Sequence, residues 1–150
     1  TYWPQFFLGL TFNWGIIMSW TSITNSISPE PIILYIAAIF WTLGYDTIYG
    51  LQDIKDDEII GVKSTSIKFK SYVKIFVGTC YSLCVLLILI LSFFMEIDKY
   101  IIGLSAFFIF SLAYQIKNLK PNNPKSCLYN FKLNNLTGAL IFLFIFSFNF

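Results

Sequence analysis

The most regular feature of the chain is the alternation of long uncharged segments with short polar ones. Charged side chains are absent from residues 1–29, 31–45, 75–95, 100–116 and 133–150. With its flanks, each segment is near the roughly 17–25 residues that a helix needs to cross a bilayer. The pattern predicts an all-α, polytopic transmembrane bundle with five spans, at about 5–23, 31–49, 73–95, 100–116 and 133–150.

Proline, glycine and asparagine mark where these spans begin and end. Pro31 fits the first turn of a helix, where its missing N–H has no intrahelical partner anyway. Residues 50–72 contain Gly61 as a hinge and predict a cap on the inner side of the membrane. Asn134 or Asn135 is expected to cap the last helix, because an asparagine side chain accepts from the free N–H groups of a first turn.

The composition supports a membrane protein. Of the 150 residues, 57% are hydrophobic and 12% are charged, and the mean hydropathy is +0.70. Soluble domains carry about 25% charged residues. The alternative, a buried helix in a large soluble core, applies best to the short segment 31–45.

Lysine supplies all ten basic residues, and its distribution predicts how the chain lies in the membrane. Nine of the ten fall in the second and fourth connections, and the exception is Lys99. Loops that are rich in lysine stay on the cytoplasmic side. The connection at 50–72 is therefore expected to face the cytoplasm, or the matrix of a mitochondrion. The net charge of +2 follows from this topology and indicates no nucleic-acid partner.

An acidic cluster lies where the second predicted span meets water. Five of the eight acids fall between Asp46 and Glu58. On one helix, Asp53 and Asp57 would lie about 40° apart around the axis and about 6 Å apart along it. Carboxylates with substrate phosphates are the usual ligands of Mg²⁺. We therefore expect Asp53 and Asp57, with Asp56 beside them, to bind a metal; the alternative is a solvated charge run.

Two further arguments concern depth and helix polarity. Counting about 1.5 Å per residue from Pro31, Asp46 lies roughly 22 Å into a core of about 30 Å. An acid at that depth predicts a functional site, although a packing acid bonded to Tyr49 or to a neighbouring helix is the alternative. Acids at the C-terminal end of a span oppose the helix dipole, so a cation is expected to offset Asp53, Asp56 and Asp57.

Other metal and nucleotide motifs fail. The position two after Asp53 is Lys55 and the sixth position is Glu58, which excludes an EF-hand loop. The run from Gly61 lacks the glycines of a P-loop. Lys63 remains a candidate phosphate partner, with the hydroxyl of Ser64 beside it, or else an ordinary lysine of an inner loop. The chain has three Cys and no His, which leaves too few ligands for zinc.

Two stretches of the chain resemble a known family. The sequence Tyr-Asp-Thr-Ile-Tyr at 45–49, followed by Asp-Ile-Lys-Asp-Asp at 53–57 and Ile-Gly-Val-Lys-Ser-Thr at 60–65, resembles the second aspartate-rich region of UbiA-type intramembrane aromatic prenyltransferases. The stretch 123–139 is similar to the closing loop and last helix of the 4-hydroxybenzoate polyprenyltransferases of ubiquinone biosynthesis. The resemblance runs the length of the chain and corresponds to the later five of nine spans.

The resemblance implies transfer of a polyprenyl group from polyprenyl diphosphate to 4-hydroxybenzoate, with Mg²⁺ as cofactor. It implies an enzyme of a bacterial or mitochondrial inner membrane. The implied roles are metal binding by Asp53, Asp56 and Asp57, diphosphate binding by Lys63 and Ser64, and catalysis by Asp46 and Tyr49.

One part of the family pattern is absent. The first aspartate-rich motif, Asn-Asp-x-x-Asp-x-x-x-Asp, has no counterpart, and the chain opens directly into apolar sequence without Met. The chain is therefore expected to be the later part of a longer protein, inactive without its earlier helices. It has no pattern of a signal peptide.

Three alternatives remain open at this point. Another prenyl acceptor, such as homogentisate, a naphthoate, haem or a chlorophyllide precursor, would fit the same motifs. A transporter or channel fragment is the second alternative, and it predicts a second interrupted helix near the middle of the membrane. A non-catalytic remnant of a split gene is the third.

Overall fold

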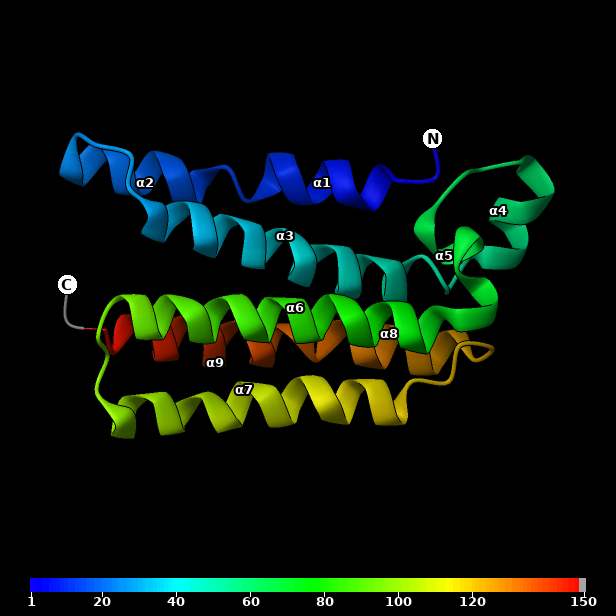
Figure 1. The fold of residues 1–150 in the computed structure, drawn as a ribbon. Helices are drawn as coiled ribbons and strands as arrows, with labels where there is room; N and C mark the ends of the chain where they lie inside the picture. The colour runs from blue at the N-terminus through cyan, green and yellow to red at the C-terminus, as the bar shows by residue number, and fades with distance from the viewer. Residues whose placement is uncertain (149–150) are drawn as a thin grey trace.

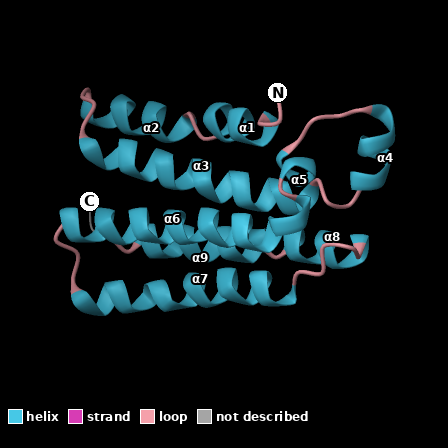
Figure 2. Ribbon diagram, turned by 45° about the vertical axis from the view of Figure 1, so that its right-hand side comes forward, coloured by secondary structure: helices cyan, strands magenta, loops and turns pink. Residues whose placement is uncertain are grey.

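The computed structural model describes residues 1–148, and all regular elements in this range are helices (Figure 2). In chain order they are α1 Pro4–Phe12, α2 Gly15–Thr24, α3 Pro29–Tyr49, α4 Ile54–Ile60, α5 Thr65–Lys68, the 3₁₀ turn η1 Lys70–Tyr72, α6 Val73–Phe94, α7 Lys99–Asn118, α8 Pro124–Lys132 and α9 Asn134–Phe146.

Four stretches within the described residues are long and apolar enough to cross a membrane. They are Pro4–Thr24, Pro29–Tyr49, Lys70–Phe94 and Lys99–Asn118. They confirm the helical membrane fold and lie close to the first four predicted spans, although the first is interrupted between α1 and α2. The fifth predicted span is shorter than expected: α9 has 13 residues, follows directly on α8, and ends before residues 149–150, which lie outside the described residues.

Local sequence explains several of the helix ends. Proline occupies the first turn of α1, α3 and α8, as its missing N–H allows. Asp98 and Asn123 accept hydrogen bonds from the first turns of α7 and α8. The expected cap of the last helix by Asn134 or Asn135 is wrong: Leu133 holds that position in helical conformation, and the Asn134 side chain contacts other helices instead.

The long helices lie side by side as layers (Figure 1). The broken pair α1 and α2 runs along α3, and α6 lies between α3 and α7. Of the last two helices, α8 packs mainly against α3 and α9 mainly against α7. The contact of α3 with α6 is the most extensive. It is close because Gly44 presents no side chain to Tyr81: a Cβ there would lie 2.5 Å from a ring carbon of Tyr81.

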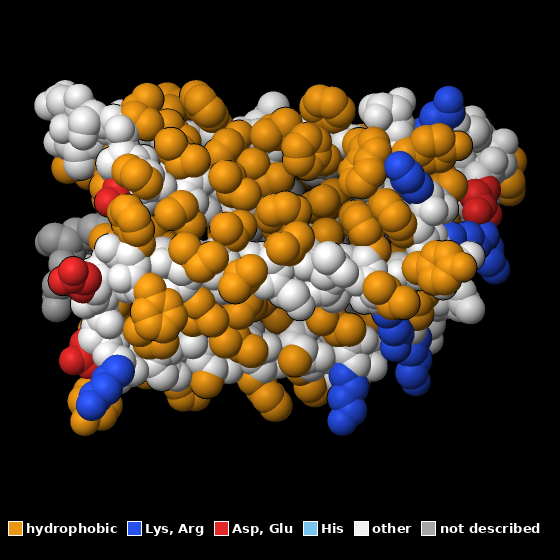
Figure 3. All heavy atoms as spheres, viewed as in Figure 1, with side chains coloured by type: hydrophobic (Ala, Val, Ile, Leu, Met, Phe, Trp, Pro, Cys, Tyr) orange, Lys and Arg blue, Asp and Glu red, His pale blue; other side chains and the backbone are white. Residues whose placement is uncertain are grey.

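The outer surface of the bundle is apolar. Large side chains such as Phe12, Ile75 and Phe110 stand with about 70% of their area exposed (72%, 69% and 72%). Hydrophobic atoms cover the middle of the face drawn in Figure 3, whereas most lysines gather at the end that carries α4 and α5. A soluble protein rarely exposes so large an apolar area. The distribution matches a bundle whose middle faces lipid and whose lysine-rich end faces water.

Candidate functional site

The acidic segment lies at the lysine-rich end of the bundle, on a short helix of its own. The span α3 ends at Tyr49, and a turn beginning at Gly50 leads into α4. Asp53 holds the N-cap position of α4, and Asp56 and Asp57 lie in its first turn. The expectation that these acids oppose a helix dipole is therefore wrong. At the N-terminal end of α4 the dipole favours their negative charge.

Asp53 and Asp57 are joined through the backbone across the first turn of α4. The backbone N–H of Asp57 donates to the carbonyl of Asp53 at 2.9 Å. Asp53 and Asp56 are exposed and Asp57 is half-buried. Among residues 1–148 none of these three carboxylates has a hydrogen bond or an ion pair, whereas the neighbouring Glu58 pairs with Lys70 at 2.8 Å.

The donor chemistry of this segment fits a hard divalent cation. Its available groups are carboxylate oxygens without protein partners, which Mg²⁺ and Ca²⁺ prefer to nitrogen or sulfur. Within the described residues, no three Asp, Glu, Cys or His side chains converge as a preformed metal site. Mg²⁺ usually takes one or two carboxylates and completes its shell with substrate phosphates and water. Asp53 and Asp57 match such an arrangement, and their metal role stays a prediction.

The helix α4 stands apart from the bundle (Figure 2). Its one buried side chain within the described residues is Ile54, and Ile59 and Ile60 are exposed. It ends at Gly61, whose φ of +76° is a left-handed conformation that glycine adopts without strain. The acids therefore lie on a segment that is attached to the bundle mainly through its two ends. We name this segment, which joins α3 to α5 and contains α4, the arm.

A buried polar junction fixes the base of this arm. The hydroxyls of Thr47 and Thr65 share a hydrogen bond of 2.7 Å, and the hydroxyl of Ser66 donates to the carbonyl of Thr47 at 2.8 Å. The backbone N–H of Thr65 donates to Oε1 of Gln5 at 3.0 Å. All four side chains are buried. The junction holds α5 against both α3 and α1, and sequence analysis missed it, since single hydroxyls in polar loops carry no distinctive pattern.

The two predicted phosphate partners lie directly before α5. Lys63 is exposed, with Nζ 5.7 Å from the centre of the Tyr2 ring. Ser64 is buried, and its Oγ caps α5 by accepting from the N–H of Ile67 at 3.3 Å. The Ser64 hydroxyl therefore has a structural role in addition to the predicted one, which stays a prediction.

Asp46 lies one turn before the end of α3. It is half-buried, and in the described part of the chain its carboxylate has neither a hydrogen bond nor an ion pair. The alternative in which Asp46 bonds to Tyr49 is therefore not observed. Tyr49 is 45% exposed, and its ring centre lies 4.7 Å from that of Phe131 on α8. An acid without a partner beside aromatic rings is able to bind or accept a proton from a ligand.

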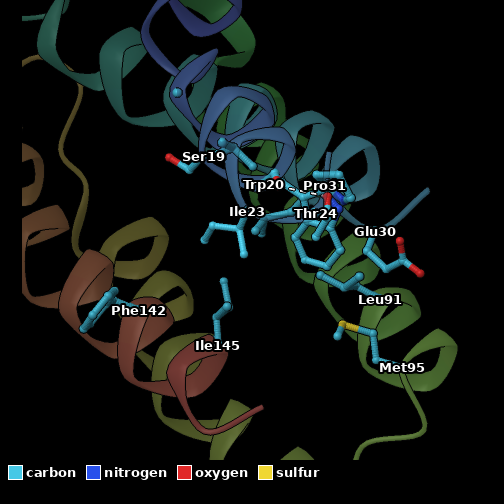
Figure 4. A pocket seen from close by; sticks show the side chains of 13 residues that line it. Ser19, Trp20, Ile23, Thr24, Glu30, Pro31, Leu91, Met95, Phe142 and Ile145 are labelled. Carbon is cyan, nitrogen blue, oxygen red and sulfur yellow. Dashed lines mark hydrogen bonds between the residues drawn. The ribbon is translucent and has the colours of Figure 1, made fainter. Parts of the chain in front are cut away.

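An apolar groove lies at the other end of the bundle. It has a volume of about 640 Å³ and lies between α2, the start of α3, the end of α6, and α9. Figure 4 shows Ile23 facing Phe142 and Ile145 across it, with Glu30 at the rim. Its lining is almost entirely apolar, and it includes none of the predicted site residues.

Comparison with known proteins gives consistent matches. The UbiA prenyltransferase family matches residues 1–146. The chain is 41% identical to "4-hydroxybenzoate polyprenyltransferase, mitochondrial" of Bos taurus over 145 residues, which are 95% of this chain and 39% of that protein. It is 35% identical to "4-hydroxybenzoate octaprenyltransferase" of Aliivibrio fischeri over 149 residues, 97% of this chain and 51% of that protein. It is 36% identical to "4-hydroxybenzoate polyprenyltransferase, mitochondrial" of Arabidopsis thaliana over 144 residues, which are 95% of this chain and 35% of that protein.

These curated relatives are longer than the chain, which spans about a third to a half of their length. No solved structure gives a significant match. The break between α1 and α2 is the interrupted helix that the transporter alternative predicts. That span contains no charged residue, however, and the family match points to a different class of protein.

Proposed function

Because the chain belongs to the UbiA prenyltransferase family, we propose that it forms part of an enzyme that transfers a polyprenyl group from polyprenyl diphosphate to the ring of 4-hydroxybenzoate, with Mg²⁺ as cofactor, in ubiquinone biosynthesis. The observation that carries this proposal is the position of Asp53, Asp56 and Asp57. Three carboxylates without protein partners lie at the polar end of an apolar bundle, where the diphosphate of a lipid would meet water while its isoprenoid chain stays in hydrocarbon.

The acidic segment binds the diphosphate end of the donor. Asp53 and Asp57, with Asp56 beside them, are the residues that would hold Mg²⁺ next to the diphosphate. When bound, the ion would neutralise part of the negative charge that develops on the leaving diphosphate. Lys63 is exposed on the same connection and adds a positive charge near that group. The Ser64 hydroxyl accepts from Ile67 and keeps its own hydrogen for a phosphate oxygen.

Asp46 and Tyr49 act on the acceptor side. Asp46 lies deeper than the acidic segment and has no protein partner among residues 1–148, so its carboxylate is free to orient the acceptor or to take a proton from it. The rings of Tyr49 and Phe131 pack together at the same end of α3, with their centres 4.7 Å apart. Aromatic faces stabilise positive charge, and an apolar wall excludes water from an allylic cation.

The complete enzyme requires more than these 150 residues. We propose that a preceding stretch supplies the first aspartate-rich motif and the remaining helices, in keeping with the greater length of the relatives. The protein would lie in a bacterial or mitochondrial inner membrane with α4 facing the cytoplasm or matrix. Homogentisate, a naphthoate or haem as acceptor fits the same diphosphate chemistry, and the names of the relatives favour hydroxybenzoate.

The test uses membranes that contain the intact protein. They are incubated with radiolabelled 4-hydroxybenzoate, a polyprenyl diphosphate and Mg²⁺, and the label extracted with lipid is counted. We expect label in the lipid fraction that depends on both the donor and Mg²⁺. Parallel reactions with labelled homogentisate and a labelled naphthoate identify the acceptor. Transfer that persists when Mg²⁺ and other divalent ions are chelated would contradict the proposed role of the acids.

A further inference from the structure

A continuous network of hydrogen bonds joins four helices inside the membrane-spanning part of the bundle. The hydroxyl of Tyr81 on α6 donates to Oε1 of Gln115 on α7 at 3.1 Å. Nε2 of Gln115 donates to the hydroxyl of Thr137 on α9 at 2.8 Å. Nδ2 of Asn134 on α9 donates to the same Oε1 at 3.1 Å, and Nε1 of Trp41 on α3 donates to Oδ1 of Asn134 at 3.0 Å.

The network fixes which way the Asn134 amide faces. Nε1 of Trp41 can only donate, so Asn134 presents Oδ1 to Trp41 and Nδ2 to Oε1 of Gln115. Tyr81, Gln115, Asn134 and Thr137 are all buried. In an apolar interior, an amide that loses its hydrogen-bond partners raises the free energy of the fold. The observed orientations of the Gln115 and Asn134 amides are therefore strongly preferred.

Trp41 is held by this bond and by the shape of α9. Gly138 leaves a notch for the indole: a Cβ at Gly138 would lie 2.9 Å from a ring carbon of Trp41. The indole packs edge-on against Tyr45, with ring centres 5.5 Å apart. Phe131 in turn lies 6.0 Å from Tyr45 and 4.7 Å from Tyr49. We name these four rings, Trp41, Tyr45, Tyr49 and Phe131, the aromatic wall.

The aromatic wall leads from the acidic segment into the membrane. Tyr49, Tyr45 and Trp41 are spaced four residues apart on α3, about 6 Å for each step along the axis. Tyr49 is the last residue of α3, next to the turn that leads to Asp53. A chain attached to a diphosphate at Asp53 and Asp57 would meet Tyr49 first and Trp41 last.

We propose that Asn134 is a positioning residue that, through its hydrogen bond with Trp41, sets the distal part of the aromatic wall and thereby the preference for long prenyl donors over short ones. The inference rests on the proposed function and extends it to the recognition of chain length. A five-carbon donor reaches only the rings near the diphosphate, whereas a twenty-carbon donor extends to Tyr45 and Trp41. Asn134 itself touches neither substrate.

The test compares kcat/KM of the intact protein for dimethylallyl diphosphate and geranylgeranyl diphosphate. Asn134→Leu removes the acceptor for Trp41, and Trp41→Phe removes the donor. We expect each to lower the preference for the longer donor roughly three- to tenfold, the factor that an aromatic contact of ordinary strength gives. The double variant should lose no more than either single one, because both remove the same contact.

Thr137→Val is the matched control. Thr137 is buried in the same network one turn from Asn134, and its hydroxyl bonds to Ser111, Gln115 and the carbonyl of Leu133, none of which belongs to the aromatic wall. We expect this variant to be less stable with an unchanged preference for chain length. Any of three results would overturn the proposal. They are an equal loss of preference in Thr137→Val, additive effects of Asn134→Leu and Trp41→Phe in the double variant, and an unchanged preference in Asn134→Leu. If Asn134→Leu does not fold, an unchanged preference in Trp41→Phe overturns it.

A spectroscopic measurement separates this proposal from the proposed function. In a background where every other tryptophan of the intact protein is changed to Phe, including Trp3, Trp14 and Trp20 of this chain, the emission comes from Trp41 alone. Asn134→Leu should shift that emission and Thr137→Val should not, whether or not the protein transfers prenyl groups. A protein that shows the shift without any transfer refutes the proposed enzyme and retains the Asn134 contact. An unshifted emission refutes the positioning itself.

Discussion

Replacing Gly50 by alanine tests whether the arm that carries the acids is fixed by the buried polar junction. A Cβ at Gly50 would lie 2.5 Å from Oγ of Ser66, an atom that donates to the carbonyl of Thr47 at 2.8 Å. Gly50 has φ of −65°, so alanine itself fits the backbone. The cost must therefore come from the displaced Ser66 and the junction that it closes.

The magnitude follows from two opposing effects. Overpacking a tight site costs about 1–3 kcal/mol, and an unsatisfied buried hydrogen-bonding group costs a similar amount. Alanine regains up to about 1 kcal/mol because it restricts the unfolded chain. Together these contributions give a net loss of about 1–6 kcal/mol. Each kcal/mol lowers the midpoint of thermal unfolding by roughly 2–4 °C in a protein of about 150–250 residues.

The assay is thermal unfolding of the intact protein in detergent, with Gly103→Ala as the matched control. Gly103 lies within α7, and a Cβ there meets no atom within 4 Å, so alanine should be neutral or stabilising. Gly50→Ala should also weaken binding of a prenyl diphosphate. In a Ser66→Ala background the Gly50→Ala change should cost less, since the clashing oxygen is gone. Equal unfolding midpoints for Gly50→Ala and Gly103→Ala would refute the junction as the element that holds the arm.

Two further predictions concern the acids and the orientation of the chain. Asp53→Ala or Asp57→Ala should each lower Mg²⁺-dependent prenyl transfer roughly 100-fold or more in a radiolabel assay, while Glu58→Gln, whose acid pairs with a lysine, should keep most of it; near-normal transfer by either alanine variant would refute the metal assignment. A cysteine introduced at Lys63 should react with a membrane-impermeant maleimide from the cytoplasmic or matrix side alone. Native Cys127 should stay unlabelled at neutral pH, because burial raises the pKa of its thiol and keeps it protonated until the pH rises above the usual thiol range.

The membrane fold was predictable because uncharged, apolar segments of this length are rare in soluble proteins and typical of membrane spans. The spacing of Asp53 and Asp57 was predictable for a different reason: any helix that contains both places them one turn apart. The separation of α4 from α3 was missed. It had a signal in the sequence, since Gly50 allows a turn and an aspartate followed by two acids in the next turn is typical of a helix start.

Contacts between distant parts of the chain could not be predicted in the same way. Asn134 looked like a helix cap, because an asparagine before an apolar run is common at that position. Its real partners, Trp41 and Gln115, lie on other helices, and only the packing of α3, α7 and α9 brings the three together. The break between α1 and α2 was missed because the segment is uncharged throughout and long enough for one span. At the break, the hydroxyl of Tyr35 donates to the carbonyl of Leu10 at 2.6 Å, which satisfies a group that the interrupted helix leaves free.

The start of α4 also changes what the acid variants can show. At the end of a long span, each carboxylate would be unfavourable for the fold, and its removal would stabilise the protein. At the N-terminus of α4, each carboxylate gains about 0.3–1 kcal/mol from the helix dipole, so its removal costs only that amount. The acids have no other partner in residues 1–148 whose loss would add to this cost. Asp53→Ala and Asp57→Ala should therefore fold nearly as well as the parent, and a 100-fold loss of transfer in either would report on ligand binding. Gly50→Ala, in contrast, should lose stability and binding together, because it moves the arm without removing a carboxylate.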